Sequence, residues 1–226
     1  DLEKAFRNKL HNVIAPYLED IDYARETQKL PTLIDSNPDE GTLRNWASGL
    51  MSRHASSRER LPVLHQFYQD IFNIIGTPTT LIDLACALDP LALPWMNLPN
   101  LSSYLAFDIN KPRVDFLNAF FSNFFPQAHA IQRDVLASPP SMKADCAFFL
   151  KEAHRFEKRR AGSNRYFFEN LNVNFLVVSL PASDLNGHHS LEKYHNELIR
   201  KAIAGFDWPC TQIQVGDELI YLINKQ

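Results

Sequence analysis

The residues with the clearest chemical signature lie around two apolar segments in the middle of the chain. The first segment, residues 80–84, is followed by a run of small residues and then by Pro90, a residue that commonly opens a helix. Small residues let backbone N–H groups approach a ligand, and the N-terminus of a helix adds a favourable dipole. The second segment, residues 104–107, ends at Asp108, twenty-five residues after Asp83. An acidic residue at the end of a second strand is a typical ligand of ribose hydroxyls. The pattern predicts a nucleotide-cofactor site, and the absence of G-x-G-x-x-G favours a cofactor without a pyrophosphate.

The same stretch carries a family resemblance. Residues 83–96 resemble motif I of the aminoglycoside-resistance 16S rRNA (guanine-N7) methyltransferases. Further similar segments follow the family's order along the chain, at residues 9–11, 54–61, 156–163, 179–181 and 216–223. The resemblance covers nearly the whole chain, and it implies that the family's first few dozen residues are missing here. It also implies S-adenosylmethionine (SAM) as the cofactor and 16S rRNA of the small ribosomal subunit as the partner.

The methionine part of SAM is expected to meet residues of the first motifs. Arg60 takes the position of the family arginine that grips the methionine carboxylate, because a guanidinium can donate two parallel hydrogen bonds to it. The other residues expected near the methionine part lie at the end of the first strand and in the small-residue loop: Asp83, Ala85, Cys86 and Ala87. Lys151 is a further cofactor-binding candidate.

The nucleoside part is expected to meet the ends of the next two strands. Asp108 is the candidate for the ribose diol, with Ile109 packing on the adenine ring. Asp134 is the candidate acceptor for the adenine amine, and the backbone N–H of Val135 is expected to meet the ring. The alternative for each aspartate is that it only caps the loop or helix that follows its strand.

Two loop residues depart from the family pattern. Ala87 stands where the family has Gly, and Asp89 stands where it has Asn. If position 87 needs a positive φ, alanine destabilises the loop by roughly 1 kcal/mol or more. The negative charge of Asp89 could help the sulfonium of SAM or repel its carboxylate.

RNA contact is expected near the end of the fourth strand and in the loop after the fifth. The segment 151–165 is rich in basic residues, which suits phosphate contact, although a solvated helix face is an equal alternative. The RNA-binding candidates are Lys151, Arg155, Arg159, Arg160, His188 and His189. No catalytic base is assigned, because the guanine N7 already carries a free lone pair. No metal site is expected, because the histidines lack metal-ligand spacing to cysteines or carboxylates.

The elements needed to position these residues alternate between strands and helices from residue 80 onward, which predicts a parallel sheet. The strands are expected near residues 80–84, 102–107, 128–132, 145–149, 174–179, 211–215 and 218–224. The helices are expected near residues 1–29, 42–53, 58–75, 90–96, 111–124, 152–170 and 188–203. Pro31 and residues 35–41 predict a turn-rich connection, residues 56–59 a capping box, and residues 216–217 a hairpin turn. Seven strands ending in an antiparallel hairpin are typical of the Rossmann-like class I SAM-dependent methyltransferases.

Composition sets the remaining expectations. The 226 residues are expected to divide into a small helical N-terminal domain, residues 1–55, and a SAM-binding domain, residues 56–226. The family resemblance implies that the first domain docks on RNA or the ribosome and that it is truncated here. The net charge of −3 weighs against nonspecific RNA binding, so the target is expected to be structured. Three cysteines without C-x-x-C spacing predict a reduced, cytoplasmic protein, and the lack of an apolar run of 18 residues predicts no membrane span. A monomer is expected. The alternatives are a weakened or non-catalytic relative that binds SAM or RNA, and a small-molecule methyltransferase.

Overall fold

The centre of the molecule is a seven-stranded mixed sheet in the order β3-β2-β1-β4-β5-β7-β6. The computed structural model describes residues 21–184 and 189–226. The strands are β1 (Thr80–Leu84), β2 (Ser103–Asp108), β3 (Ala128–Gln132), β4 (Ala144–Leu150), β5 (Val173–Pro181), β6 (Cys210–Val215) and β7 (Glu218–Asn224). The first five are parallel, and β7 pairs antiparallel with both β5 and β6. Every predicted strand is confirmed to within two residues, and Gly216, with a φ of 57°, makes the predicted hairpin turn.

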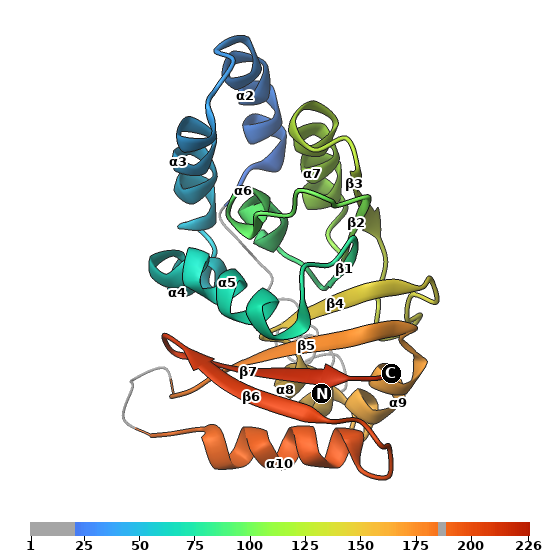
Figure 1. The fold of residues 1–226 in the computed structure, drawn as a ribbon. Helices are drawn as coiled ribbons and strands as arrows, with labels where there is room; N and C mark the ends of the chain where they lie inside the picture. The colour runs from blue at the N-terminus through green and yellow to red at the C-terminus, as the bar shows by residue number, and fades with distance from the viewer. Residues whose placement is uncertain (1–20, 185–188) are drawn as a thin grey trace, which may run out of the picture.

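Helices cover both faces of the sheet (Figure 1). One face packs against α2 (Tyr23–Asp35), α3 (Glu40–Met51), α5 (Leu64–Ile75), α6 (Leu93–Met96) and α7 (Lys111–Phe124). The other face packs against α8 (Ala153–Arg159), α9 (Ser163–Asn170) and α10 (Glu192–Ile203). The short elements α4 (Ala55–Arg60), η2 (Leu61–Val63) and η3 (Asp89–Ala92) lie on the connections.

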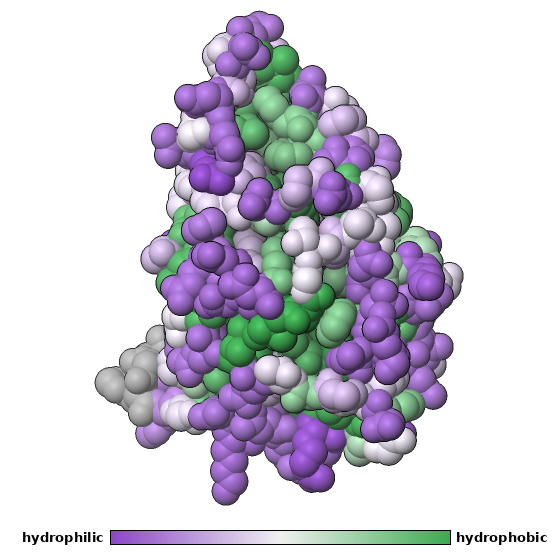
Figure 2. Space-filling model, in the orientation of Figure 1, coloured by the Kyte–Doolittle hydropathy of each residue, from purple (hydrophilic) through white to green (hydrophobic). Residues whose placement is uncertain are grey.

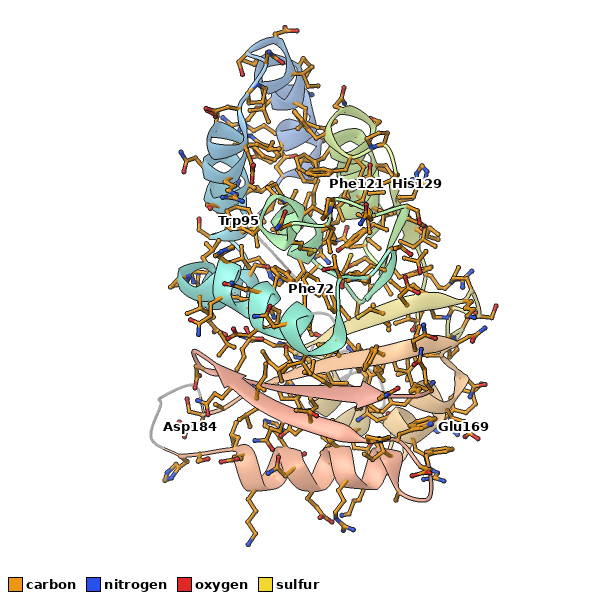
Figure 3. All side chains as sticks on the ribbon, viewed as in Figure 1. Phe72, Trp95, Phe121, His129, Glu169 and Asp184 are labelled. Atoms are coloured by element: carbon orange, nitrogen blue, oxygen red, sulfur yellow. The ribbon has the colours of Figure 1, made fainter. Side chains whose placement is uncertain are left out.

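The sheet separates two hydrophobic cores, because side chains alternate along each strand. In β4, Phe148 belongs to the core under α5, while its neighbour Phe149 belongs to the core under α8 and α9. Three aromatic side chains labelled in Figure 3, Phe72, Trp95 and Phe121, come from α5, α6 and α7 and pack in or against the first core. The parallel strands are therefore packed on both faces, and this packing holds their carboxyl ends in place.

The two N-terminal helices belong to the first core. Tyr23 of α2 contacts Phe116 of α7 with ring centroids 5.7 Å apart, and Trp46 of α3 stacks on Phe120 at 5.5 Å. The turn predicted at Pro31 is wrong, because α2 continues through Pro31 to Asp35. The larger part of the helix predicted over residues 1–29 lies outside the described residues.

Three predicted helices differ in their limits. The helix predicted over residues 58–75 is divided into α4, η2 and α5, with a proline in η2, and the predicted capping box is wrong because α4 begins at Ala55 without a side-chain cap. The helix predicted over residues 152–170 is interrupted at Gly162, where φ is 79°, and the last helix begins at Glu192. Backbone turns that depend on a single residue were thus harder to predict than the strands.

The surface in the view of Figure 2 is mostly hydrophilic. A hydrophobic area interrupts it over the end of α5, where the side chain of Ile74 is 47% exposed. Within the described ranges, no helix has the length and apolar character needed to cross a membrane.

Candidate cofactor and substrate cavity

A cavity opens at the carboxyl ends of the parallel strands, where ligands bind in sheets of this kind. It encloses about 270 Å³. Its floor is formed by the loop after β1 and the ends of β2 and β3, through Ala85, Ala87, Asp108, Asp134 and Val135. Most of the candidate cofactor residues are therefore brought to one place by the topology of the sheet.

The loop after β1 has a strained backbone. Ala85 has a φ of 54° and Ala87 a φ of 47°, in the left-handed region that favours glycine. The N–H of Cys86 donates to the carbonyl oxygen of Phe107 over 3.0 Å, and the N–H of Ala87 donates to Asp108 Oδ2 over 3.0 Å. Position 87 does need a positive φ, as the family's glycine there suggests, and an L-residue in this conformation is less stable by about 1–2 kcal/mol.

Asp108 joins this loop to the N-terminal helices. Its Oδ2 also accepts a hydrogen bond from Arg113 Nη1 at 2.6 Å, and Arg113 Nε donates to the hydroxyl of Tyr23 at 2.9 Å. Its Oδ1 accepts from the N–H of Asn110 at 2.7 Å. A carboxylate offers about four acceptor positions, so these three bonds leave one for a ligand. Asp108 is thus held in a fixed orientation at the cavity wall.

The nucleoside candidates at the end of β3 are more open. Asp134 is exposed, and its Oδ1 accepts from the N–H groups of Leu136 and Ala137 at 3.0 and 3.2 Å. Val135 is buried, whereas Ile109 is 49% exposed on the cavity wall. An exposed isoleucine beside a buried valine offers an apolar surface for a flat ring.

Arg60 lies behind the cavity in a buried network of charges. Its Nε and Nη2 donate to the two carboxylate oxygens of Glu218, each at 2.9 Å, and its Nη1 donates to Asp89 Oδ1 at 2.8 Å. The arginine is 1% exposed, and its pKa stays above the ordinary range because the two carboxylates outweigh the effect of burial. Asp89 lines the cavity, whereas Arg60 is not among the residues that do. Direct contact of Arg60 with a methionine carboxylate therefore stays a prediction.

Lys151 belongs to the same network. Its Nζ lies 2.6 Å from Glu59 Oε2 and 3.2 Å from Glu218 Oε1, and the residue is 7% exposed with a φ of 59°. Lys151 is not among the cavity-lining residues, and neither are Asp83 and Cys86, which are buried below the loop. Burial raises the pKa of Asp83, whose Oδ2 accepts from the hydroxyl of Tyr104 at 2.6 Å.

Several arginines belong to the rest of the cavity wall, together with other side chains such as Glu152 and Phe156. Arg155 and Arg159 of α8, two of the predicted RNA-binding residues, line it together with Arg53, Arg58 and Arg133, which the sequence analysis did not single out. Arg53 directly precedes the 54–61 motif and Arg58 lies within it, so that motif could have indicated both. Arg160 and His189 are exposed but do not line the cavity, and His188 lies outside the described residues. The cavity thus combines an acidic floor with a basic wall.

The described residues offer no alternative metal centre. Among residues 21–184 and 189–226, no group of three or more His, Cys, Asp or Glu side chains is placed to hold a metal ion.

Comparisons with known proteins agree with this arrangement. Residues 1–222 match the family model described as ribosomal RNA methyltransferase (FmrO). The chain is 31% identical to the 16S rRNA (guanine(1405)-N(7))-methyltransferase of Micromonospora rosea, over 100% of this chain and 83% of the relative. It is 32% identical to the protein of the same name from Micromonospora echinospora, with the same coverage. Among solved structures, the 16S rRNA methyltransferase RmtF in complex with S-adenosylhomocysteine has a TM-score of 0.78 and 26% identity, covering 99% of this chain and 83% of that one.

Proposed function

Because the chain belongs to the ribosomal RNA methyltransferase (FmrO) family, we propose that it transfers a methyl group from SAM to N7 of a guanine in the 16S rRNA of the small ribosomal subunit. The Micromonospora relatives are named for guanine 1405, and we propose the same target here. The modification is expected to reduce aminoglycoside binding and so give resistance. Since the substrate is ribosomal, we also propose that the protein acts in the cytoplasm, as a monomer.

The observation that carries the proposal is the cavity at the strand ends. It gathers the loop after β1, Asp108 with Ile109, and Asp134 with Val135, which come from three different strand ends. The cavity lining fits SAM. Carboxylates can accept hydrogen bonds from a ribose diol and attract a cationic ligand, and Ile109 and Val135 offer apolar contact to an adenine ring. We propose that the loop holds the methionine part, Asp108 the ribose, and Asp134 and Val135 the adenine.

The reaction needs alignment more than acid or base catalysis. SAM would supply a methyl group bound to a cationic sulfur. In the transfer, the lone pair of guanine N7 would form the bond to the methyl carbon, and the electron pair of the carbon–sulfur bond would stay on sulfur. N7 has no proton to lose, so the contribution of this chain is to hold the two partners in line and to exclude water. The hydrogen-bonded loop after β1 and the carboxylate of Asp108, held by three hydrogen bonds, suit that purpose.

The basic wall of the cavity is the proposed site of RNA contact. Arg155 and Arg159 on α8 and Arg58 on α4 stand around the cavity, where phosphates near the target guanine would pass. Of the further RNA candidates, Arg160 and His189 are exposed, whereas Lys151 is buried and paired with Glu59. A local basic wall on a chain of net charge −3 suits a target recognised by its shape.

The test is methyl transfer from labelled SAM to purified bacterial 30S subunits. We expect label in 16S rRNA, and strand cleavage after reduction and aniline treatment should map an N7-methylguanine at position 1405. Turnover should fall steeply with ionic strength, because phosphate contacts release counterions. Absence of label in 30S subunits, beside an active relative as the positive control, would contradict the proposal. Salt-independent methylation of a small molecule would instead favour a small-molecule enzyme.

A further inference from the structure

The carboxylate of Asp89 has one oxygen without a protein partner at the cavity wall. Its Oδ1 accepts from Arg60 Nη1 at 2.8 Å and lies 3.4 Å from the hydroxyl of Ser57. No described residue donates to its Oδ2. The residue is 4% exposed, and it lines the cavity. A carboxylate oxygen that faces a cavity takes its hydrogen-bond donor from water or from a bound ligand.

The buried network that holds Asp89 contains more carboxylates than cations. Arg60 is shared with Glu218, which takes two of its hydrogen bonds, and Lys151 is shared between Glu218 and Glu59. The three carboxylates of this network are thus met by two cations. Asp89 is the member that lines the cavity, so the remaining negative charge is available to a ligand there.

We propose that Asp89 binds the α-ammonium group of the methionine part of SAM, and that Arg60 is the positioning residue that holds Asp89 for this contact. The inference rests on the proposed function, because it assumes that the cavity holds SAM. An ammonium group satisfies both needs of Asp89 Oδ2, since it donates hydrogen bonds and carries a positive charge. The sulfonium of SAM carries a positive charge but has no N–H or O–H, so it could not donate a hydrogen bond to Asp89 Oδ2. Asp89 lies in the turn where the methionine part is expected, since its N–H donates to the carbonyl oxygen of Cys86 at 2.9 Å.

The test compares two ligands on two proteins by titration calorimetry. The ligands are S-adenosylhomocysteine and its analogue in which hydrogen replaces the α-amino group. In the wild-type protein, loss of the amino group should weaken binding about ten- to a hundredfold, which is the usual effect of a hydrogen bond to a charged group. In Asp89→Asn, the same change of ligand should weaken binding less than about threefold. The ratio of the two affinities within one protein is insensitive to a partly unfolded sample.

Control variants keep the outcome unambiguous. Asp115→Asn removes one carboxylate from the exposed surface of α7, where it pairs with Lys111, and should leave both the affinities and their ratio unchanged. If Asp89→Asn does not fold, Asp89→Glu keeps the charge but displaces the oxygen, and the same loss of discrimination is expected. An unchanged ratio in the folded Asp89 variant, or equal affinities of the two ligands for the wild-type protein, overturns the assignment of Asp89. If the wild-type protein binds neither ligand, the proposed cofactor cavity itself fails.

Discussion

Replacement of Arg60 by methionine should strongly destabilise the fold, whatever its effect on catalysis. The guanidinium is buried and makes three hydrogen bonds to the carboxylates of Asp89 and Glu218. Methionine fills much of the space but leaves both carboxylates buried, with Lys151 near Glu218 and Ser57 near Asp89. Removing one partner of a buried ion pair reduces stability by about 3–5 kcal/mol. For a chain of this size, each kcal/mol lowers Tm by roughly 2–4 °C, so the expected loss is about 6–20 °C.

The loss should depend on pH in a direction that the structure fixes. Burial raises the pKa of Glu218, but Arg60 and Lys151 lower it more, so in the folded wild-type protein its pKa lies below the ordinary 4.5. That contribution to stability is present above pH 4.5 and is lost as the pH falls through the folded pKa. Without Arg60, burial should raise the folded pKa above 4.5. The contribution then has the opposite sign, being present below 4.5 and lost as the pH rises.

The assay is urea unfolding followed by circular dichroism at pH 5 and at pH 8. The difference in unfolding free energy between wild type and Arg60→Met should be larger at pH 8. Arg58→Met, on an exposed arginine two residues earlier in the same helix, should change stability by less than about 0.5 kcal/mol. A folded Arg60→Met with wild-type stability at both pH values, but without affinity for S-adenosylhomocysteine, would refute this reasoning and favour a direct contact of Arg60 with the methionine carboxylate.

Three further predictions concern the loop, the half-buried His154 and the basic wall. Ala87→Gly should raise Tm by about 2–4 °C in a thermal melt, because glycine adopts the left-handed conformation of position 87 without strain. The control Ala202→Gly, inside α10, should lower Tm. A lower Tm for Ala87→Gly would show that the loop is not strained. Burial, together with the nearby positive charge of Arg155, lowers the pKa of His154 from 6.5 to about 4, so the wild type should lose about 2–3 kcal/mol as the pH falls from 6.5 to 4. In His154→Gln that loss should be smaller by urea unfolding at both pH values, and equal losses in the two proteins would contradict the burial argument. Arg159→Gln should reduce the slope of log affinity for 30S subunits against log salt concentration by about 0.7–0.9. The control Arg200→Gln, on α10, should leave this slope unchanged. Identical slopes for wild type and Arg159→Gln would show that Arg159 does not contact a phosphate.

The sequence was sufficient for the sheet and for the floor of the cavity. Apolar strand runs alternate with helical segments. Asp108 ends β2 and Asp134 lies two residues after β3, so their place at the carboxyl edge follows from topology. The sequence raised a positive φ at position 87 only as a possibility, because the resembling family has glycine there, and it did not indicate the positive φ of Ala85.

The buried network could not be predicted in the same way. Arg60 is separated from Glu218 by 158 residues along the chain, and nothing in the local pattern of a short charged helix indicates that one of its arginines is fully buried. The link from Tyr23 through Arg113 to Asp108 likewise joins residues 90 positions apart. The predicted ends of helices were wrong where a single residue determines them, as at Pro31 and Gly162.

The packing of α2 and α3 has a consequence for modular engineering of this family. A cut near residue 55, between the predicted docking segment and the predicted SAM-binding domain, crosses a continuous hydrophobic interface and not a linker. Transplanting the first helices of another family member would leave Phe116 and Phe120 of α7 facing unmatched partners in place of Tyr23 and Trp46. A chimera with altered ribosome docking would therefore need the aromatic face of α7 exchanged together with the helices, so the unit of recombination is the three-helix group and not the N-terminal segment alone.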